Sequence, residues 1–145
     1  MIEEITSADR STAETISALL GQLTTHPCPF GEREVQRIIA DPASHLFVAR
    51  IEGKVVAMLT LGSYLSPTGR KAWIEDVVVD EVFRGQGLGR KLVEFAIQYS
   101  KTHLAPCTLM LTSNPARVAA NELYRSSGFE QKITNVYKLN CPDNE

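Results

Sequence analysis

The sequence predicts one α/β domain of the α+β type, with a mixed, mostly antiparallel sheet of six to seven strands and helices on both faces. Three observations support this prediction. Short segments rich in β-branched and apolar residues recur along the chain, and Glu52-Gly53 joins two of them as a tight hairpin turn. Between residues 72 and 100, a strand, a glycine-rich loop and a helix follow one another, and this order leads into a parallel strand. A chain of 145 residues has the length of a single domain, over residues 1–145.

Two helices are predicted in the first third of the chain. Ser11 and Glu14 have the spacing of a capping box, and the apolar residues that follow predict a helix over Thr12–Leu23. The segment Thr24–Phe30 contains two prolines and is predicted to be a loop. A shorter helix follows, and Asp41-Pro42 ends it because the residue before a proline disfavours helical geometry.

Three strands follow these helices. The segments Leu46–Ile51 and Lys54–Tyr64 flank the predicted hairpin turn, so they should pair in antiparallel fashion. A turn at Ser66–Gly69 separates the second of them from a third strand over Ala72–Val79. The first part of the sheet is therefore predicted to be antiparallel.

The last third of the chain alternates again between strands and a helix. The segment Cys107–Thr112 is predicted to run parallel to the third strand, because a helix ending near residue 100 forms the crossover. Asn114, as an N-cap before Pro115, and Gly128, as a stop, predict one more helix. Two short strands over Phe129–Ile133 and Val136–Leu139 are predicted to complete the sheet.

Composition excludes several classes of function. A net charge of −2 provides no basic field for nucleic acid, which is not expected as a partner. The first residues lack the features of a secretory signal, and no apolar run is long enough to span a membrane, so we expect a cytoplasmic protein without a membrane partner. Three cysteines without a Cys-x-x-Cys pair suit reduced thiols, and the histidines lack ligand spacing, so we expect no metal.

The stretch Arg84-Gly85-Gln86-Gly87-Leu88-Gly89-Arg90 lies between a strand and a helix, where backbone N–H groups can bind an anion such as a diphosphate. The spacing matches neither a Walker A loop nor the dinucleotide fingerprint, which leaves the pattern Arg-x-x-Gly-x-Gly. A nucleotide-phosphate enzyme is also disfavoured, because the Lys-Ser/Thr magnesium pattern is absent. The alternative is that the glycines only turn the chain between the two elements.

This loop after a valine-rich strand, together with a helix that carries Asn121 and Tyr124 and ends in Gly128-Phe129, resembles the GNAT family of N-acetyltransferases. The segment Trp73–Asp80 is also similar to the corresponding strand of small bacterial members and of amino-sugar-phosphate acetyltransferases. The likeness covers nearly the whole chain in element order. It implies the acyl-CoA N-acyltransferase fold, in which the two central parallel strands splay apart, and it implies transfer of an acetyl group from acetyl-CoA to a primary amine.

The resemblance also implies which residues contact the co-substrate. The backbone of the glycine loop would hold the CoA diphosphate, the valine-rich strand would pair with the pantetheine, and the helix residues would lie near the sulfur. The CoA-binding residues implied in this way are Val77, Val78, Val79, Arg84, Gly85, Gln86, Gly87, Leu88, Gly89, Arg90, Asn114, Asn121 and Tyr124.

Acetylation of an amine requires a base, because an alkylammonium with a pKa of about 10.4 is almost fully protonated at neutral pH. Glu75 and Asp76 are adjacent on a strand, so they are expected to point to opposite faces, and only one would serve the site. In a regular strand Glu75 shares a face with Val77 and Val79, whereas a bulge would change the assignment beyond it. Glu75 is the favoured base, with Asp76 or a water as alternatives, and solvated surface carboxylates are the non-catalytic interpretation.

Tyr124 is the predicted catalytic partner of the base. The leaving thiolate corresponds to a thiol with a pKa of roughly 8.5, so a tyrosine hydroxyl is a sufficient proton donor. Tyr124 follows Asn121 by three residues, and this spacing places both on one helical face. The alternative is a buried aromatic residue whose hydroxyl is satisfied by the backbone.

The acceptor is expected to be a small-molecule amine, because the compact chain lacks an insertion that would bind a peptide. The segments Thr24–Arg33 and Leu65–Lys71 are expected to line the acceptor side. Alternatives are a protein or peptide amine acetyltransferase, or a catalytically silent CoA-binding sensor. The family resemblance also allows a homodimer formed through the terminal strands.

Overall fold

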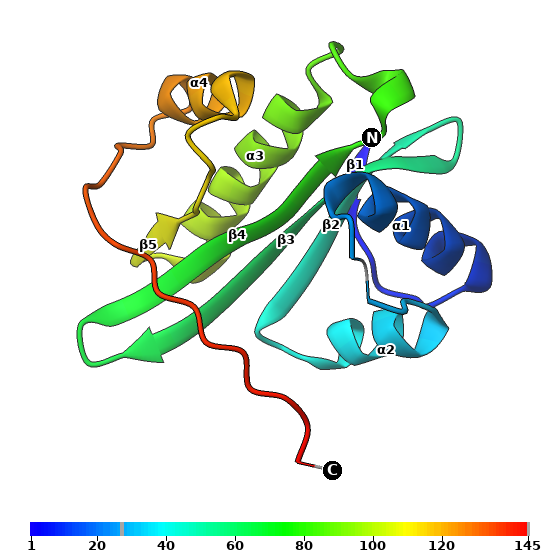
Figure 1. The fold of residues 1–145 in the computed structure, drawn as a ribbon, viewed down its shortest axis with the longest axis horizontal. Helices are drawn as coiled ribbons and strands as arrows, with labels where there is room; N and C mark the ends of the chain where they lie inside the picture. The colour runs from blue at the N-terminus through cyan, green and yellow to red at the C-terminus, as the bar shows by residue number, and fades with distance from the viewer. Residues whose placement is uncertain (27, 145) are drawn as a thin grey trace.

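The computed structural model describes residues 1–26 and 28–144. In these ranges five strands form one sheet in the order β1-β2-β3-β4-β5, and helices pack on it (Figure 1). The strands are β1 (Ile2–Glu4), β2 (Ser44–Ile51), β3 (Lys54–Ser66), β4 (Gly69–Val79) and β5 (Cys107–Met110). The helices are α1 (Arg10–Leu23), α2 (Glu32–Ala40), α3 (Leu88–Tyr99) and α4 (Val118–Ser126), with a 3-10 turn η1 (Glu81–Phe83) and a π-helical turn η2 (Ser100–Leu104).

The helices cover both faces of the sheet, as predicted. Figure 1 shows α1 and α2 on one side and α3 and α4 on the other. Two apolar cores result: one includes Ile16 and Val35 from α1 and α2, and the other includes Leu92 and Tyr124 from α3 and α4. No helix within 1–26 and 28–144 combines the length and the hydropathy that a membrane crossing requires.

The pairing of the strands confirms the predicted mixed sheet. Strands β1 to β4 are antiparallel to their neighbours, and the hairpin between β2 and β3 turns at Glu52 and Gly53, both with positive φ. Strand β5 is parallel to β4, as the crossover through α3 requires. Strand β1, which the sequence analysis did not identify, adds to the edge of β2 at Ile2–Glu4.

The start of α1 differs from the predicted capping box. Asp9, not Ser11, is the N-cap, and its Oδ1 accepts a hydrogen bond of 2.7 Å from the Thr12 backbone N–H. Glu14 binds Arg10 Nε at 3.0 Å instead of reaching back to the cap. Asp9 is a good N-cap because its carboxylate accepts a hydrogen bond from a free backbone N–H of the first turn. Its negative charge is also stabilised by the dipole at the helix N-terminus.

The start of α4 also differs from its prediction. The helix begins at Val118, so Asn114 is not its N-cap. Asn114 Oδ1 instead accepts a hydrogen bond of 2.9 Å from Ala116 N, which forms a local turn before the helix. The predicted stop is confirmed, since Gly128 has a φ of 103° directly after the last turn.

The two predicted C-terminal strands are not present in the described residues. Both Phe129–Ile133 and Val136–Leu139 are irregular, and the expected six to seven strands are therefore five. In the view of Figure 1 the segment runs from α4 past β5 and across β4 and β3 to the C-terminus. A strand requires a neighbour to satisfy its backbone groups, and no described part of the chain provides one here. Ile133 and Tyr137 consequently remain exposed, at 103% and 89%.

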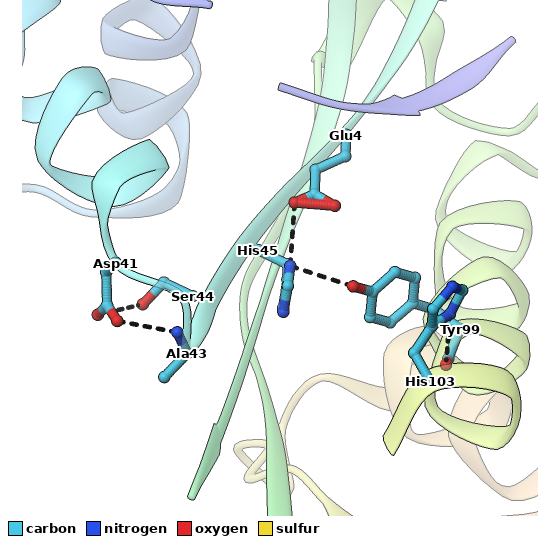
Figure 2. A network of polar contacts seen from close by, with 7 residues as sticks. All are labelled: Glu4, Asp41, Ala43, Ser44, His45, Tyr99 and His103. Atoms are coloured by element: carbon cyan, nitrogen blue, oxygen red, sulfur yellow. Dashed lines mark hydrogen bonds and ion pairs between the residues drawn. The ribbon is translucent and has the colours of Figure 1, made fainter. Parts of the chain in front are cut away.

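Polar contacts connect the sheet to the C-terminal end of α3 (Figure 2). His45 Nδ1 lies 2.9 Å from Glu4 Oε2 and 3.4 Å from the Tyr99 hydroxyl, and His103 stacks on the Tyr99 ring. Burial, and to a smaller extent the Glu4 carboxylate, raise the pKa of Tyr99. These contacts join β1, β2, α3 and η2, and they help to hold α3 against the sheet.

Candidate active site

A β-bulge interrupts β4 at its centre. Met58 pairs with Val78 and Thr60 pairs with Glu75, so the two residues between them on β4 face the single residue Leu59 on β3. Asp76 in the bulge has a φ of 51°, a conformation that few residues other than glycine adopt and that aspartate tolerates comparatively well.

The bulge reverses the alternation of side chains along β4. Ile74 packs in the core beside α3, and Val77 and Val79 pack against the same core, whereas Val78 belongs to the core beside α1 and α2. Ile74, Val77 and Val79 can share one face only because the bulge adds a residue between Ile74 and Val77, since residues on one face of a regular strand are two positions apart. The alternative in which a bulge changes the assignment is therefore confirmed, and Glu75 does not share a face with Val77 and Val79.

A second consequence concerns the two acidic residues. Glu75 and Asp76 line the same cavity, although adjacent residues of a regular strand point to opposite faces. The expectation that only one of them could serve the site was wrong, because the bulge turns the backbone between them. The structure brings both carboxylates together.

The cavity opens where β4 and β5 part. Their pairing ends at Trp73 and Met110, so the β5 side of Val77–Val79 has no strand partner among the described residues. The cavity has a volume of about 410 Å³. Its lining comes from β4, the residues directly after β5, the end of α1 with the loop after it, and α4 with its N-cap residue: Leu20, Leu23, Thr24, His26, Cys28, Ile74, Glu75, Asp76, Val77, Leu111, Thr112, Arg117 and Tyr124.

Tyr124 reaches this cavity from α4. Its ring is 7% exposed and packs edge-on against Phe129, with 6.2 Å between the ring centroids. No residue within 1–26 or 28–144 forms a hydrogen bond with its hydroxyl. The backbone-satisfied hydroxyl that the non-catalytic interpretation requires is thus not seen, and the group is available to a ligand.

Asn121 and Asn114 hold the turn at the start of α4. Asn121 Nδ2 donates hydrogen bonds to Asn114 O at 3.0 Å and to Arg117 O at 2.8 Å. Both amide hydrogens of Asn121 are thereby used within the protein. The geometry shows a structural role for this side chain, while its carbonyl oxygen remains available for a ligand.

Three groups in the cavity have shifted pKa values. Desolvation raises the pKa of Glu75, and the charge of Asp76 raises it further. Desolvation also raises the pKa of Asp76. Burial raises the pKa of Tyr124, and the Arg117 guanidinium opposes this effect. The carboxylates are therefore stronger bases than those in water, which suits proton abstraction near neutral pH.

The glycine loop has the geometry of an anion site. Gly85 and Gly87 have φ values of 83° and 78°, and a Cβ added at either would meet no protein atom within 4 Å. Gly87 begins α3 without a side-chain cap, whereas Asp9 caps α1 and Glu34 caps the Gly31 N–H of α2. The first N–H groups of α3 are thus uncapped and face open space, as a diphosphate requires.

The neighbouring residues attach this loop to the cavity. Arg84 Nε donates a hydrogen bond of 3.0 Å to Val79 O, which holds the loop against the end of β4. A Cβ on Gly89 would lie 3.7 Å from Val79, so α3 packs closely on that strand. Arg90 donates a hydrogen bond of 2.9 Å to Ser126 Oγ and thereby joins α3 to α4.

The structure adds residues that the sequence analysis missed. Arg117 and Thr112 line the cavity, and Arg117 could have been found because it precedes Tyr124 by seven residues, two helical turns on one face. Of the two predicted acceptor segments, Thr24–Arg33 contributes to the lining, with its Pro27 outside the described residues. No residue of Leu65–Lys71 lines the cavity, because this turn lies at the far end of β4.

Comparisons with known proteins agree with this geometry. The model of the Acetyltransferase (GNAT) family matches residues 15–129. In sequence, the chain is 36% identical over 93 residues to the glucosamine 6-phosphate N-acetyltransferase of Arabidopsis thaliana; the match covers 58% of the chain and spans 62% of the relative's length.

Solved structures resemble the whole fold. A putative acetyltransferase from Agrobacterium tumefaciens has a TM-score of 0.81 and 26% identity, and the match covers 97% of this chain and 99% of that chain. The crystal structure of glucosamine-6-phosphate N-acetyltransferase from Arabidopsis thaliana has a TM-score of 0.79 and 26% identity, with 96% and 97% covered. Because the family model also covers well over half of the chain, this protein belongs to the GNAT family of acetyltransferases.

Proposed function

We propose that this protein transfers the acetyl group of acetyl-CoA directly to the primary amine of a small molecule, as a single domain over residues 1–145. One observation carries the proposal. The cavity at the point where β4 and β5 part is lined by two carboxylates and by Tyr124, whose hydroxyl has no hydrogen-bond partner among the described residues. At the end of β4, α3 begins with a glycine loop that has no side-chain cap within this part of the chain.

Acetyl-CoA supplies an activated thioester when it is bound. The N–H groups of residues 84–90 would hold its diphosphate, since two loop glycines leave the concavity open. The β5 side of Val77–Val79, which has no strand partner among the described residues, would bind the pantetheine in the manner of an added strand. Asn114 and Asn121 would support this site from the start of α4, where their mutual hydrogen bond already orders the turn.

Glu75 on β4 and Tyr124 on α4 would then carry out different proton transfers. Glu75, whose pKa desolvation and the Asp76 charge both raise, would take a proton from the acceptor ammonium, directly or through a water. Tyr124 would donate its proton to the departing sulfur. Direct transfer needs no covalent enzyme intermediate, so Cys28 at the cavity requires no nucleophilic role.

The acceptor is proposed to be small because the cavity has room for a compact ligand and not for a folded partner. The Arabidopsis relative is by name an enzyme for glucosamine 6-phosphate, which provides a first candidate acceptor. Two other hypotheses stay open to the same test: acetylation of a peptide amine, and a CoA-binding sensor without catalysis.

The deciding experiment measures thiol release from acetyl-CoA in the presence of different amines. The panel should contain glucosamine 6-phosphate, unphosphorylated amino sugars, polyamines and short peptides with free N-termini. Stimulation by small amines with formation of the N-acetyl product supports the proposal. Stimulation by peptides alone supports the second hypothesis, and CoA binding by calorimetry without release for any amine supports the sensor.

The glycine loop provides a binding prediction. Gly87→Ala is expected to weaken CoA binding by about tenfold, because a side chain at φ 78° strains the loop by about 1–2 kcal/mol and crowds the anion site. The measurement is the dissociation constant of CoA by calorimetry.

Gly53→Ala is the matched control for this variant. Gly53 has a φ of 80° and equally open surroundings but lies in the β2–β3 hairpin. It should lower the melting temperature by a similar amount and leave the CoA affinity unchanged. Equal CoA affinity in both variants would exclude the loop as the diphosphate site.

We further propose that two copies of the chain associate through the C-terminal segment 130–144. Ile133, Tyr137 and Leu139 would lie on one face of an extended segment, yet they are 103%, 89% and 87% exposed. Strand β5 is the last strand of the sheet, and its outer edge has no strand partner among the described residues. A second copy would provide the missing partner.

Sedimentation should therefore show a dimer for the unaltered chain. Serine at Ile133, Tyr137 and Leu139 is expected to yield a monomer, since the apolar face is lost. Serine at Tyr64, Leu65 and Val82, which are also exposed but lie elsewhere, should leave the dimer intact. A monomeric unaltered chain at micromolar concentration would contradict the proposal.

A further inference from the structure

The Arg117 guanidinium is the feature of the cavity that the proposed reaction leaves unused. Arg117 lines the cavity together with Tyr124 and the two carboxylates. Within residues 1–26 and 28–144, no hydrogen bond or ion pair engages its guanidinium, whereas Arg125 on the same helix lies 3.6 Å from Glu122. Arg117 is exposed to solvent at the wall of the cavity, and a cation in this position can stabilise negative charge that develops there.

The backbone of Arg117 is firmly held. Its N–H donates to Asn114 O at 3.0 Å, and its carbonyl accepts from Asn121 N at 3.0 Å and from Asn121 Nδ2 at 2.8 Å. Arg117 is the N-cap residue of α4 and Tyr124 lies on that helix, and both side chains line the same cavity. The start of α4 is thus built so that this cation and the tyrosine face the same space.

The acidity of Tyr124 is the chemical reason why a cation is needed. A thiol has a pKa of about 8.5 and a tyrosine one of about 10, so proton transfer from tyrosine to a thiolate is uphill by more than about one unit. Burial raises the pKa of Tyr124 and makes this proton transfer less favourable. The positive charge of Arg117 lowers the pKa of Tyr124. Burial alone would leave Tyr124 a poor acid for this step.

We propose that Arg117 is a positioning residue for the transfer, which acts through Tyr124 by stabilising the negative charge on its oxygen. This inference rests on the proposed function. The acceptor ammonium loses a proton to a cavity carboxylate, its nitrogen bonds to the acetyl carbon, and the carbon–sulfur bond breaks with its electron pair on sulfur. Tyr124 protonates the sulfur. The acylated nitrogen releases its second surplus proton, which restores Tyr124 through water.

An alternative role for the same cation is to bind an anionic group of the acceptor. The position of Arg117 beside Tyr124, and the hydrogen bonds that fix its backbone through Asn114 and Asn121, favour the electrostatic role. The two roles predict different kinetics. Support of Tyr124 lowers kcat for every amine, whereas binding of an anionic group raises KM for anionic amines only.

The test compares Arg117→Gln, Arg117→Lys and the control Arg125→Gln. Arg117→Gln is expected to lower kcat about tenfold, which corresponds to one pKa unit, for neutral and anionic amines alike and with little change in KM. Arg117→Lys should restore most of the activity because it retains the charge, and Arg125→Gln should resemble the unaltered enzyme. In a Tyr124→Phe background, Arg117→Gln should have no further effect on kcat.

A second readout does not depend on activity. The ultraviolet absorbance of tyrosinate, taken as the difference between each protein and its Tyr124→Phe counterpart, follows the titration of Tyr124 alone. Arg117→Gln should move this titration to higher pH. An unchanged titration, or a rise in KM restricted to anionic amines, would overturn the proposal. If no amine is acetylated by the unaltered chain, the proposed function fails, and the titration still decides the coupling of Arg117 and Tyr124.

Discussion

Tyr124→Phe is expected to lower kcat about a hundredfold with little change in the KM for acetyl-CoA, because the departing sulfur loses its proton donor. The ring should stay in place, since it is 7% exposed and packs against Phe129. The hydroxyl has no hydrogen-bond partner among the described residues, so its removal should change the free energy of unfolding by less than about 0.5 kcal/mol. Steady-state kinetics and thermal unfolding measure both effects.

Tyr99→Phe is the control for this variant. Tyr99 also has a partly buried ring, but its hydroxyl lies 3.4 Å from His45 Nδ1, and Tyr99 is not among the residues that line the cavity. It should leave kcat unchanged. A Tyr124→Phe enzyme with full activity would show that the thiolate leaves without help from this residue.

The two carboxylates are expected to show the other large effect. Glu75→Gln should lower kcat/KM about a hundredfold, since the base is lost. Asp76→Asn should have a smaller effect and should move the acid limb of the pH profile to lower pH. The reason is that the Asp76 charge raises the pKa of Glu75, and asparagine removes that charge while tolerating the positive φ.

The same substitutions should stabilise the fold at neutral pH. Desolvation raises the pKa of both acids in the folded state, so the folded state binds more protons than the unfolded state between the two pKa values. The free energy of unfolding therefore falls as pH rises through this window, and the loss persists at pH values of about 7. Each substitution should restore part of the lost free energy of unfolding, by less than about 1 kcal/mol, because water reaches both side chains.

Thermal unfolding at acidic and neutral pH checks this expectation. The gain in melting temperature should be present near neutrality and absent below the pKa of the unfolded carboxyl groups, where the unaltered protein is already protonated. Glu94→Gln, an exposed carboxylate on α3, should change neither stability nor activity. A loss of stability at neutral pH for both cavity variants would contradict the sign of the pKa shifts.

Local patterns in the sequence predicted much of this fold. The Glu52-Gly53 hairpin, the crossover from β4 to β5 and the stop at Gly128 each depend on neighbouring residues, and the structure confirms them. The cap of α1 was missed because Asp9 and Ser11 are both good N-caps and only one can occupy the position. The prediction of two C-terminal strands was wrong. Alternation of apolar residues indicates that one face is to be buried, but it does not show which surface would cover that face.

The sequence by itself indicated the family and the order of the central elements from β2 to α4, because glycine spacing and helix periodicity act over a few residues. The tertiary structure decided how these groups meet. The bulge at Asp76 depends on the register between β3 and β4, and it places both carboxylates in one cavity. Arg117 and Tyr124 line the same cavity, and hydrogen bonds from Asn121 order the chain before α4. Contacts of this kind join distant or irregular segments, so no local pattern specifies them.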